Sequence, residues 1–335
     1  MKKLTCIALC AFIILAFVSC TNLESSKKEK ETVMQIGGFD VPYEMVQYAV
    51  MNAVDDHSAS GGKELSAEYL RSDGGKALGD EIMAEAVESL KSVYAVFALG
   101  EKYGISRSDG AIEALVDANY EEERKSYGSD KDFKKALEES HMTAAVLRVT
   151  LEFDAVYSEM YEVMLDRGDI ETDAGKLKEI FASEDFIRVK ELLFSAERHS
   201  AEECKALGEK ALSEIDSGAD FDSYVQEHGE SLFMFNNDDG YYICRGIWDK
   251  ELEDAVFSLD IGEVSEVIVN ESGARLFMRA EKSTAYIEDN FDKLKETYTE
   301  GAFRRIVEAQ LDETAATFCE GYTALTAADI AAEAK

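Results

Sequence analysis

The chain has 335 residues, of which 46% are hydrophobic, so it can bury one large core or several smaller ones, and two or more globular domains are expected. It carries 35 basic and 69 acidic residues, a formal net charge of -34. Such a field repels nucleic acid and anionic lipid, which argues against nucleic-acid partners and against adsorption to a membrane surface. It favours solubility, cations or basic partners, although charges spread along helical faces serve first as a solvated surface.

The N-terminus has the pattern of an export signal. Lys2 and Lys3 precede an apolar run over residues 6–18, which is shorter than the roughly 20 residues that a membrane-spanning helix needs. The run ends in "FVSC", which resembles a bacterial lipoprotein cleavage box with Phe17 in place of the usual Leu. Residues 1–19 are therefore predicted to be a signal peptide, and Cys20 the lipidated first residue of the mature protein.

A lipid on Cys20 would anchor the protein to the outer face of the bacterial cytoplasmic membrane. Residues 20–32 are polar and are predicted to form a flexible tether. Ordinary signal cleavage without a lipid and an uncleaved anchor are the two alternatives.

Cysteines and loop motifs predict no metal and no cofactor. Cys6 and Cys10 lie in the predicted signal peptide, and Cys20 would carry the lipid. Only Cys204, Cys244 and Cys319 remain, which are too few and too scattered for a disulfide framework or a zinc site. They are expected to be small buried apolar residues. The sequence also lacks a glycine-rich phosphate loop and a calcium-loop pattern.

Residues 33–184 are predicted to form an N-terminal helical segment. Residues 40–42 are predicted to open a helix that continues over residues 43–54, with Pro42 near its first turn, where a missing N–H costs nothing. A Gly- and Ser-rich loop follows at 58–63. Apolar spacing and closing glycines predict further helices over residues 76–103, 108–127, 130–139 and 143–167. None of them places His, Asp and Ser, or two His and a carboxylate, at catalytic or ligand spacing.

Residues 185–283 differ in composition and alternate strands with helices. Strands are predicted at residues 188–194, 241–245, 264–269 and 274–279, and helices at 201–217 and 249–257 with a further short helix after residue 221. A small mixed sheet with helices packed on it, an α+β domain, is the simplest architecture.

Residues 284–335 return to helix. One long amphipathic helix is predicted over residues 287–318, and a single helix cannot bury its apolar stripe alone. We expect this C-terminal helix to pack on the N-terminal segment, so that residues 185–283 are an insertion between two parts of one helical domain.

Four stretches resemble, in order and spacing, the blocks of the parvulin-type peptidyl-prolyl isomerase domain. They are "RVKELLF", "EKALSEIDSGADFDSYVQEHGES", "RGIWDKELEDAVFSLDIGEVSEVI" and "ESGARLFMRAEK", and the most specific part is "EDAVFSL" followed by "GEVS". The signal, the helical segment and the returning helix are similar to extracytoplasmic foldases of the PrsA type, in which the terminal parts form one chaperone domain around the isomerase. The resemblance implies an α+β protein: a helical chaperone-type domain with an inserted parvulin-like mixed-sheet domain.

The resemblance places the polar residues of the family's site on residues of a different kind. The two family histidines fall on Glu191 and Arg275, so both are absent. The Cys or Asp before the middle strand falls on Ser231, and the Thr and Ser before the last strand fall on Asn270 and Ser272. These three are the candidate catalytic residues that the resemblance leaves.

The residues at the apolar positions of the family's site are still apolar here, but they differ in type and shape. The Met and Phe that line the family's proline slot fall on Trp248 and Leu252, and Phe257 completes the predicted substrate-binding set. His199 and His228 are the other histidines of this region, and neither is predicted to point into the slot.

Glu191 and Arg275 are an acid and a base at positions that lie on neighbouring strands in the family. We hypothesise that they form an ion pair that holds the sheet; the alternative is that both are solvent-exposed strand residues. Breaking such a pair by removing one partner costs about 3 to 5 kcal/mol.

The function implied by the resemblance is a membrane-anchored folding factor that binds unfolded or partly folded exported polypeptides, with isomerase activity weak or lost. The alternative is an active isomerase with a non-standard site. A third reading is a solute-binding lipoprotein, which the lack of two parallel α/β lobes argues against. The sequence leaves a homodimer open.

Overall fold

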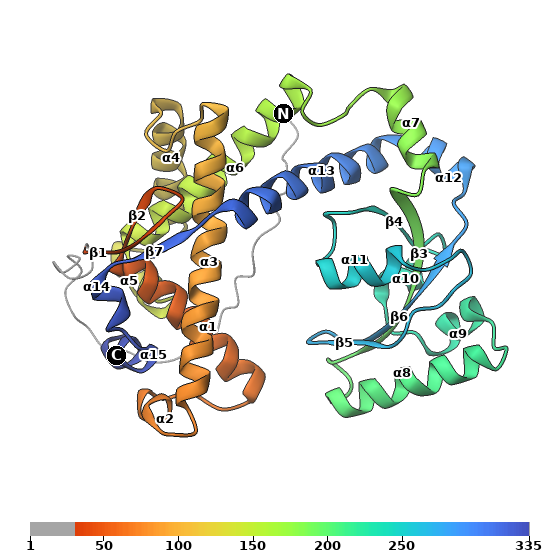
Figure 1. Ribbon diagram of the computed structural model, residues 1–335, viewed down its shortest axis with the longest axis horizontal. Coiled ribbons are helices and arrows are strands. Elements are labelled where there is room, and N and C mark those ends of the chain that lie inside the picture. The colour runs from red at the N-terminus through yellow and green to blue at the C-terminus, as the bar shows by residue number, and fades with distance from the viewer. Residues whose placement is uncertain (1–30, 335) are drawn as a thin grey trace. The chain divides into compact units, whose positions relative to one another are not determined.

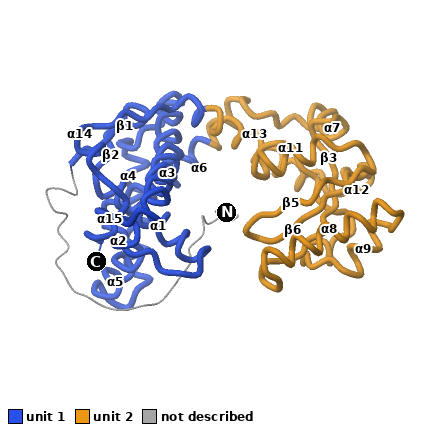
Figure 2. The backbone as a smooth tube through the Cα atoms, turned by 60° about the horizontal axis from the view of Figure 1, so that its bottom comes forward, with its two compact units in different colours: residues 1–160, 310–335 blue, residues 161–309 orange. Residues whose placement is uncertain are grey.

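The computed structural model describes residues 31–334, and the chain divides into two compact units (Figure 2). Of these residues, the helical unit contains 31–160 and 310–334, and the central unit contains 161–309. The predicted signal peptide, Cys20 and nearly all of the tether lie outside the described residues. Within residues 31–334, no helix has both the length and the apolar character to cross a membrane.

The helical unit is built on amphipathic helices. They are α1 (Tyr43–Gly61), α2 (Ala67–Arg71), α3 (Lys76–Tyr103), α4 (Gly110–Ser126), α5 (Asp130–Glu139) and α6 (Ala144–Arg167), the last of which continues into the central unit. α3 packs on α1 and buries Ile82, Leu90 and Phe97, each at most 2% exposed. The predicted bounds of α3 are confirmed, because Gly104 closes it with a left-handed φ of +79°.

Both ends of the described chain meet in this unit. β1 (Thr32–Ile36) and β2 (Phe39–Pro42) form a hairpin, and β7 (Ala316–Phe318) pairs with the other edge of β1. α14 (Glu320–Thr323) and α15 (Ala327–Glu333) follow, and α15 lies beside α1 and α2 (Figure 1). Ile330 of α15 is fully buried, and Arg71 Nη2 lies 3.0 Å from Asp329 Oδ1. The predicted fold class, with one helical domain made from N- and C-terminal segments, is confirmed.

The central unit contains a four-stranded antiparallel sheet. Its strands are β3 (Phe186–Ser195), β4 (Tyr241–Cys244), β5 (Ile268–Asn270) and β6 (Gly273–Ala280), in the order β4-β3-β6-β5. A mixed sheet was expected, but each described pairing is antiparallel, and the two-residue turn between β5 and β6 can join only antiparallel neighbours.

Helices cover both faces of this sheet (Figure 1). α8 (Ala201–Asp216) and α9 (Phe221–His228) pack on Leu192, Phe194 and Leu276. α11 (Lys250–Phe257) packs on the opposite face, where Val256 meets Val189 and Phe277. A short helix, α10 (Leu232–Asn236), lies between α9 and β4 in the chain.

The C-terminal helix is divided between the units. The predicted single helix over 287–318 is interrupted at Asn290, whose side chain and backbone N–H both donate to Tyr286 O, giving α12 (Thr284–Asp289) and α13 (Phe291–Glu313). Leu294 of α13 packs with Phe181 of α7 (Ala174–Ala182) and Phe186 in the central unit. Only the residues from Gln310 onward belong to the helical unit, whereas the whole segment was expected to pack there.

Two other predicted boundaries were wrong. α1 continues to Gly61 and is closed by Gly62 at φ +61°, so the expected loop at 58–63 begins later. The predicted strand at 264–269 is reduced to β5 because Ser265 Oγ, in place of a backbone carbonyl, accepts from Phe277 N at 3.0 Å.

The three described cysteines are free thiols. Cys204 and Cys244 are buried as expected, and burial raises the pKa of Cys244 to about 11, which keeps it protonated and unreactive. Cys319 is only half-buried, so the expectation of a buried residue was wrong there.

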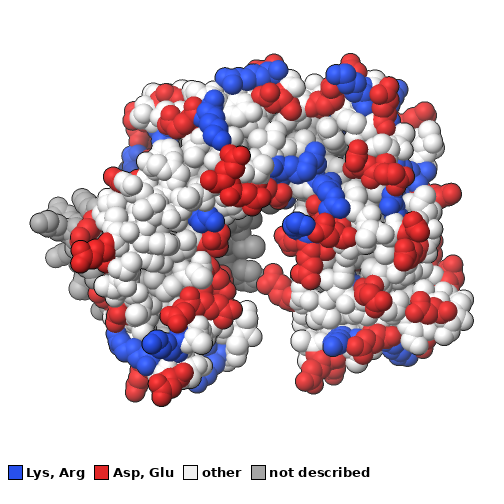
Figure 3. Space-filling model, viewed as in Figure 1, with Lys and Arg blue, Asp and Glu red and all other residues white. Residues whose placement is uncertain are grey.

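Charged side chains are spread over the surface. Figure 3 shows Asp and Glu over both units, with Lys and Arg between them. Several of the charges pair along one helix, as in Lys91–Glu88 at 2.9 Å and Lys135–Glu139 at 3.0 Å. The acidic excess is therefore chiefly a solvated surface.

Gly301 lets α13 approach the end of β4 closely. A Cβ at this position would lie 2.6 Å from Cys244 Sγ and 2.7 Å from Arg245 O. We expect Gly301→Ala to lower the free energy of unfolding by about 1 to 3 kcal/mol through overpacking, although Ala is the better helix former by about 1 kcal/mol. The change in the free energy of unfolding is measured by guanidinium denaturation, with the fluorescence of Trp248 as the signal.

Glu296→Ala, on the exposed side of the same helix, is the control and should change stability by less than about 0.5 kcal/mol. A Gly301→Ala protein as stable as the parent would mean that this close approach is not required.

Candidate functional site

Glu191 and Arg275 form a buried ion pair on the face of the sheet that α11 covers. In the register of β3 and β6, Glu191 lies opposite Phe277 and Arg275 lies opposite Leu193, so the two charged side chains are diagonal neighbours on one face. Arg275 Nε donates to Glu191 Oε1 at 2.8 Å, and Glu191 is 5% exposed. The predicted ion pair is confirmed, and the alternative of two solvent-exposed residues is wrong.

The second oxygen of Glu191 is held by two hydroxyl groups. Ser231 Oγ and Tyr241 Oη donate to Glu191 Oε2 at 2.8 and 3.1 Å. Ser231 is buried and is the N-cap of α10, so the same hydroxyl also accepts weakly from Met234 N at 3.4 Å. Three donors thus converge on one buried carboxylate, which offsets the penalty for its desolvation.

Tyr241 starts β4 and lies between the polar network and the residues predicted to line the proline slot. Burial, together with the charge of Glu191, raises the pKa of Tyr241 well above its usual value, so the phenol stays a donor at physiological pH. Its ring meets that of Trp248 edge to face, with centroids 5.2 Å apart.

Asn270 and Ser272 connect the network to the surface. Arg275 Nη1 donates to Asn270 Oδ1 at 2.8 Å, and Ser272 N donates to the same oxygen at 3.0 Å. Both residues are exposed, at the turn between β5 and β6. The structure therefore places the side chains of Ser231 and Asn270 on the Glu191–Arg275 pair, whereas Ser272 is connected to it only through its backbone N–H.

The predicted slot residues lie together. Trp248, Leu252 and Phe257 are partly buried and pack on one apolar cluster that includes Val256 and Phe277. The Trp248 ring lies 5.2 Å from that of Phe277. This arrangement gives an apolar surface beside a polar network.

Glu253 fixes the loop that carries Trp248. This carboxylate is 5% exposed, and its Oε1 accepts from Ile247 N at 2.8 Å and from Trp248 N at 2.9 Å. Sequence reasoning missed Glu253 and Tyr241. The only sequence signal for Glu253 was its place in "EDAVFSL", and for Tyr241 its place at the start of a predicted strand.

His199 and His228 do not take part in the described network. His199 Nε2 lies 2.9 Å from Glu230 Oε1, and His228 is exposed with its ring beside that of Tyr224. Burial acts to raise the pKa of Glu230, but hydrogen bonds from Ser195 N and His199 outweigh it and lower that pKa. Glu230 therefore ties the end of β3 to the segment before α10.

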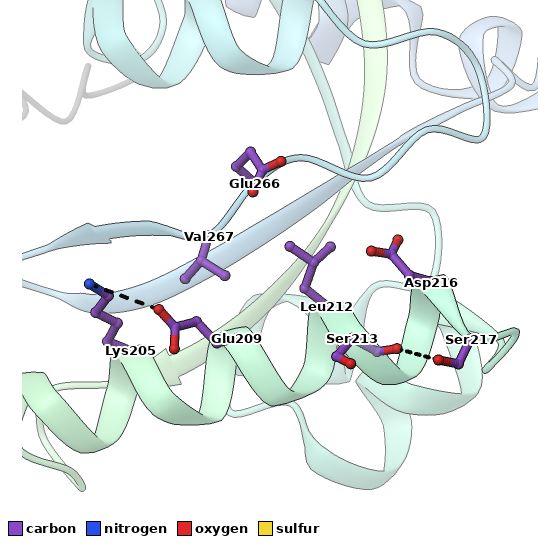
Figure 4. A pocket seen from close by; sticks show the side chains of 8 residues that line it. All are labelled: Lys205, Glu209, Leu212, Ser213, Asp216, Ser217, Glu266 and Val267. Carbon is purple, nitrogen blue, oxygen red and sulfur yellow. Dashed lines mark hydrogen bonds and ion pairs between the residues drawn. The ribbon is translucent and has the colours of Figure 1, made fainter.

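A pocket elsewhere on the central unit is lined mainly by polar and charged side chains (Figure 4). It lies between α8 and the residues before β5, with Lys205 Nζ 3.9 Å from Glu209 Oε1 at one end. Its lining shares no residue with the network or the slot. In the described part of the chain, no group of three or more His, Cys, Asp or Glu could hold a metal ion.

Residues 186–281 match the family model described as rotamase, the PPIC-type peptidyl-prolyl isomerase domain. They form a parvulin-type domain. Foldase protein PrsA of Staphylococcus aureus (strain MRSA252) is 27% identical to this chain over 192 residues, which cover 56% of this chain and 57% of that protein. The chain thus matches just over half the length of its curated relatives, and the predicted resemblance to PrsA-like parvulin proteins is confirmed.

Solved structures of PrsA proteins are also similar. The Bacillus anthracis protein aligns over 68% of this chain and 96% of its own, with 16% identity and a TM-score of 0.32. The Streptococcus pneumoniae protein aligns over 68% and 84%, with 19% identity and a TM-score of 0.32. The assignment of the parvulin-type domain rests on the family model and the sequence relatives.

We expect Glu191→Gln and Arg275→Gln each to destabilise the parvulin-type domain by about 3 to 5 kcal/mol, because each leaves the partner charge buried without compensation. The double variant should lose less than the sum of the two single losses, since the two residues act as a pair. Chemical unfolding of the four proteins gives this coupling energy.

Lys205→Gln is the matched control, since its pair with Glu209 on α8 is exposed and should contribute less than about 1 kcal/mol. Unchanged melting temperatures for both single variants would contradict the role of the buried pair.

Tyr241 should make the domain sensitive to alkaline pH. Its pKa is raised in the folded state, so its contribution is fully present below the unfolded pKa of about 10 and is lost as pH rises towards the folded pKa. Tyr241→Phe removes the hydrogen bond to Glu191 and should be less stable at pH 8, but the gap to the parent should narrow above about pH 10. Stability measured from pH 8 to 11 tests this, and a constant gap would contradict it.

Proposed function

We propose that the chain is a lipid-anchored folding factor at the outer face of the bacterial cytoplasmic membrane. It would bind unfolded or partly folded exported polypeptides, with isomerase activity weak or lost. The observation that carries this proposal is the pairing of Glu191 with Arg275, at the positions that the resemblance assigns to the family histidines, in the same domain as the apolar cluster of Trp248 and Leu252.

The physical demands of the reaction support binding over catalysis. Rotation of an X-Pro bond crosses a barrier of roughly 18 to 20 kcal/mol, and a catalyst must present free polar groups to the twisting amide. Glu191 already accepts three hydrogen bonds, and Arg275 donates one hydrogen bond to Glu191 and one to Asn270. These side chains are committed to each other, while Trp248 and Leu252 still offer an apolar surface to a proline ring.

The relatives support a folding role. They are named foldases, and they match this chain over just over half of their length. The net charge of -34 favours clients with basic segments. The anchor at Cys20 rests on the cleavage box, and a homodimer is left open.

A second candidate is an active isomerase with a non-standard site. Asn270 favours it, because Arg275 orients this exposed amide at the rim, where it would be able to hydrogen-bond a client backbone. Ser231 and Ser272 would complete the polar set. A solute-binding lipoprotein has less support, because every described strand pairing is antiparallel, unlike that of parallel α/β lobes.

We expect the chain from Thr21 onward to bind an X-Pro peptide without accelerating its isomerisation, and to suppress aggregation of reduced lysozyme, a basic unfolded protein. Trp248→Ala with Leu252→Ala should weaken peptide binding at least about tenfold, because it removes two apolar contacts with the ring. A protease-coupled isomerisation assay, fluorescence anisotropy and light scattering give the three readouts.

Ile261→Ala, at an apolar residue that is 59% exposed in a turn of the same domain, is the control and should behave like the parent. Acceleration that the double variant abolishes would establish the active isomerase instead. A parent protein that neither binds the peptide nor suppresses aggregation would contradict the folding role.

A further inference from the structure

Three large apolar side chains of α10 are exposed in a row of four residues. Leu232 is 76% exposed, Phe235 75% and Phe233 38%, whereas Met234 is buried at 3% and anchors the helix in the core. Single exposed apolar residues are normal on a protein surface, but a contiguous group marks an interaction site.

This apolar group is continuous with the slot. The ring of Phe233 stacks on that of Tyr241, with centroids 4.0 Å apart and 16° between the planes. Tyr241 in turn meets Trp248 at 5.2 Å. An aromatic series therefore runs from the exposed helix to the Trp248 side of the slot.

The position of α10 is fixed by the polar network. Ser231, its N-cap, donates to the buried Glu191, and Glu230 N donates to Leu193 O at 2.9 Å. Glu230 Oε2 also accepts from Ser195 N at 2.7 Å. Two consecutive residues therefore tie the start of α10 to β3.

We propose that Leu232, Phe233 and Phe235 form a subsite for one large apolar side chain of a client whose proline occupies the Trp248 and Leu252 slot. This inference rests on the proposed function and adds the class of segment that is preferred. The Phe233 and Trp248 rings are joined through Tyr241 and lie at most about 9 Å apart, and an extended chain advances about 3.3 Å per residue, so the side chain lies within about three residues of the proline.

The size of the patch favours a peptide over a second copy of the chain. A fully buried aromatic side chain contributes about 150 to 250 Å², so three side chains, none fully exposed, fall short of the roughly 800 Å² per partner of a stable protein interface. The acidic charge of the chain attracts a peptide segment that carries basic residues. The same charge makes two copies of the chain repel each other.

The test uses the chain from Thr21 onward and fluorescent heptapeptides with a central proline and lysine at both ends. A single Phe is moved through the other four positions, and the reference, called the all-Ala peptide, has Ala at all four. At one position, Phe should strengthen binding about tenfold over Ala. Leu232→Ser with Phe235→Ser should remove this preference and leave binding of the all-Ala peptide unchanged. Both residues are exposed, so the fold should be retained.

Ile261→Ser, a similar loss of exposed apolar surface outside the patch, should keep the preference for Phe. Equal binding of Phe and Ala peptides by the parent, or a preference that survives in the Leu232→Ser, Phe235→Ser protein, would overturn the subsite while leaving the slot in place. Absence of any binding of these peptides by the parent would overturn the proposed function itself. Self-association of the parent in sedimentation velocity that this double variant abolishes would assign the patch to a second copy.

Discussion

The buried contact between Glu191 and Arg275 is the interaction on which the central unit depends. It joins the two middle strands of the sheet diagonally, on a face that is otherwise filled by Val189, Phe277 and Val256. A charge pair in such surroundings is tolerated only when its remaining hydrogen-bonding capacity is satisfied, and Ser231 and Tyr241 supply the missing donors. The pair therefore determines what its neighbours must be.

Two surface features follow from that requirement. Because Ser231 must reach Glu191, α10 starts at a fixed place and turns Leu232 and Phe235 outward. Because Arg275 also binds Asn270, the turn between β5 and β6 is oriented at the rim of the same face. The pair thus organises an apolar platform on one side and a polar turn on the other.

In the family pattern proposed for the site, the apolar half is kept more fully than the polar half. The slot residues Trp248 and Leu252 remain apolar, and Glu253 holds the backbone that presents the indole. The polar residues have become internally paired structure. Outside the domain, α13 is shared between the two units, and β7 completes the sheet that β1 and β2 begin, so the chain must return to its start before the helical unit is whole.

The sequence by itself determined whatever depends on local spacing. The ends of α3, the order of the strands and of the helices other than α10 in residues 186–281, and the complementary charges at positions 191 and 275 all followed from residues near one another in the chain or from a family pattern. Only the tertiary structure decided that Tyr241 and Ser231 share a carboxylate with Arg275, that Phe233 stacks on Tyr241, and that residues 316–318 leave a predicted helix to pair with β1. These contacts join residues far apart in sequence, and their free energy comes from burial and hydrogen bonding across elements, which local propensity does not contain.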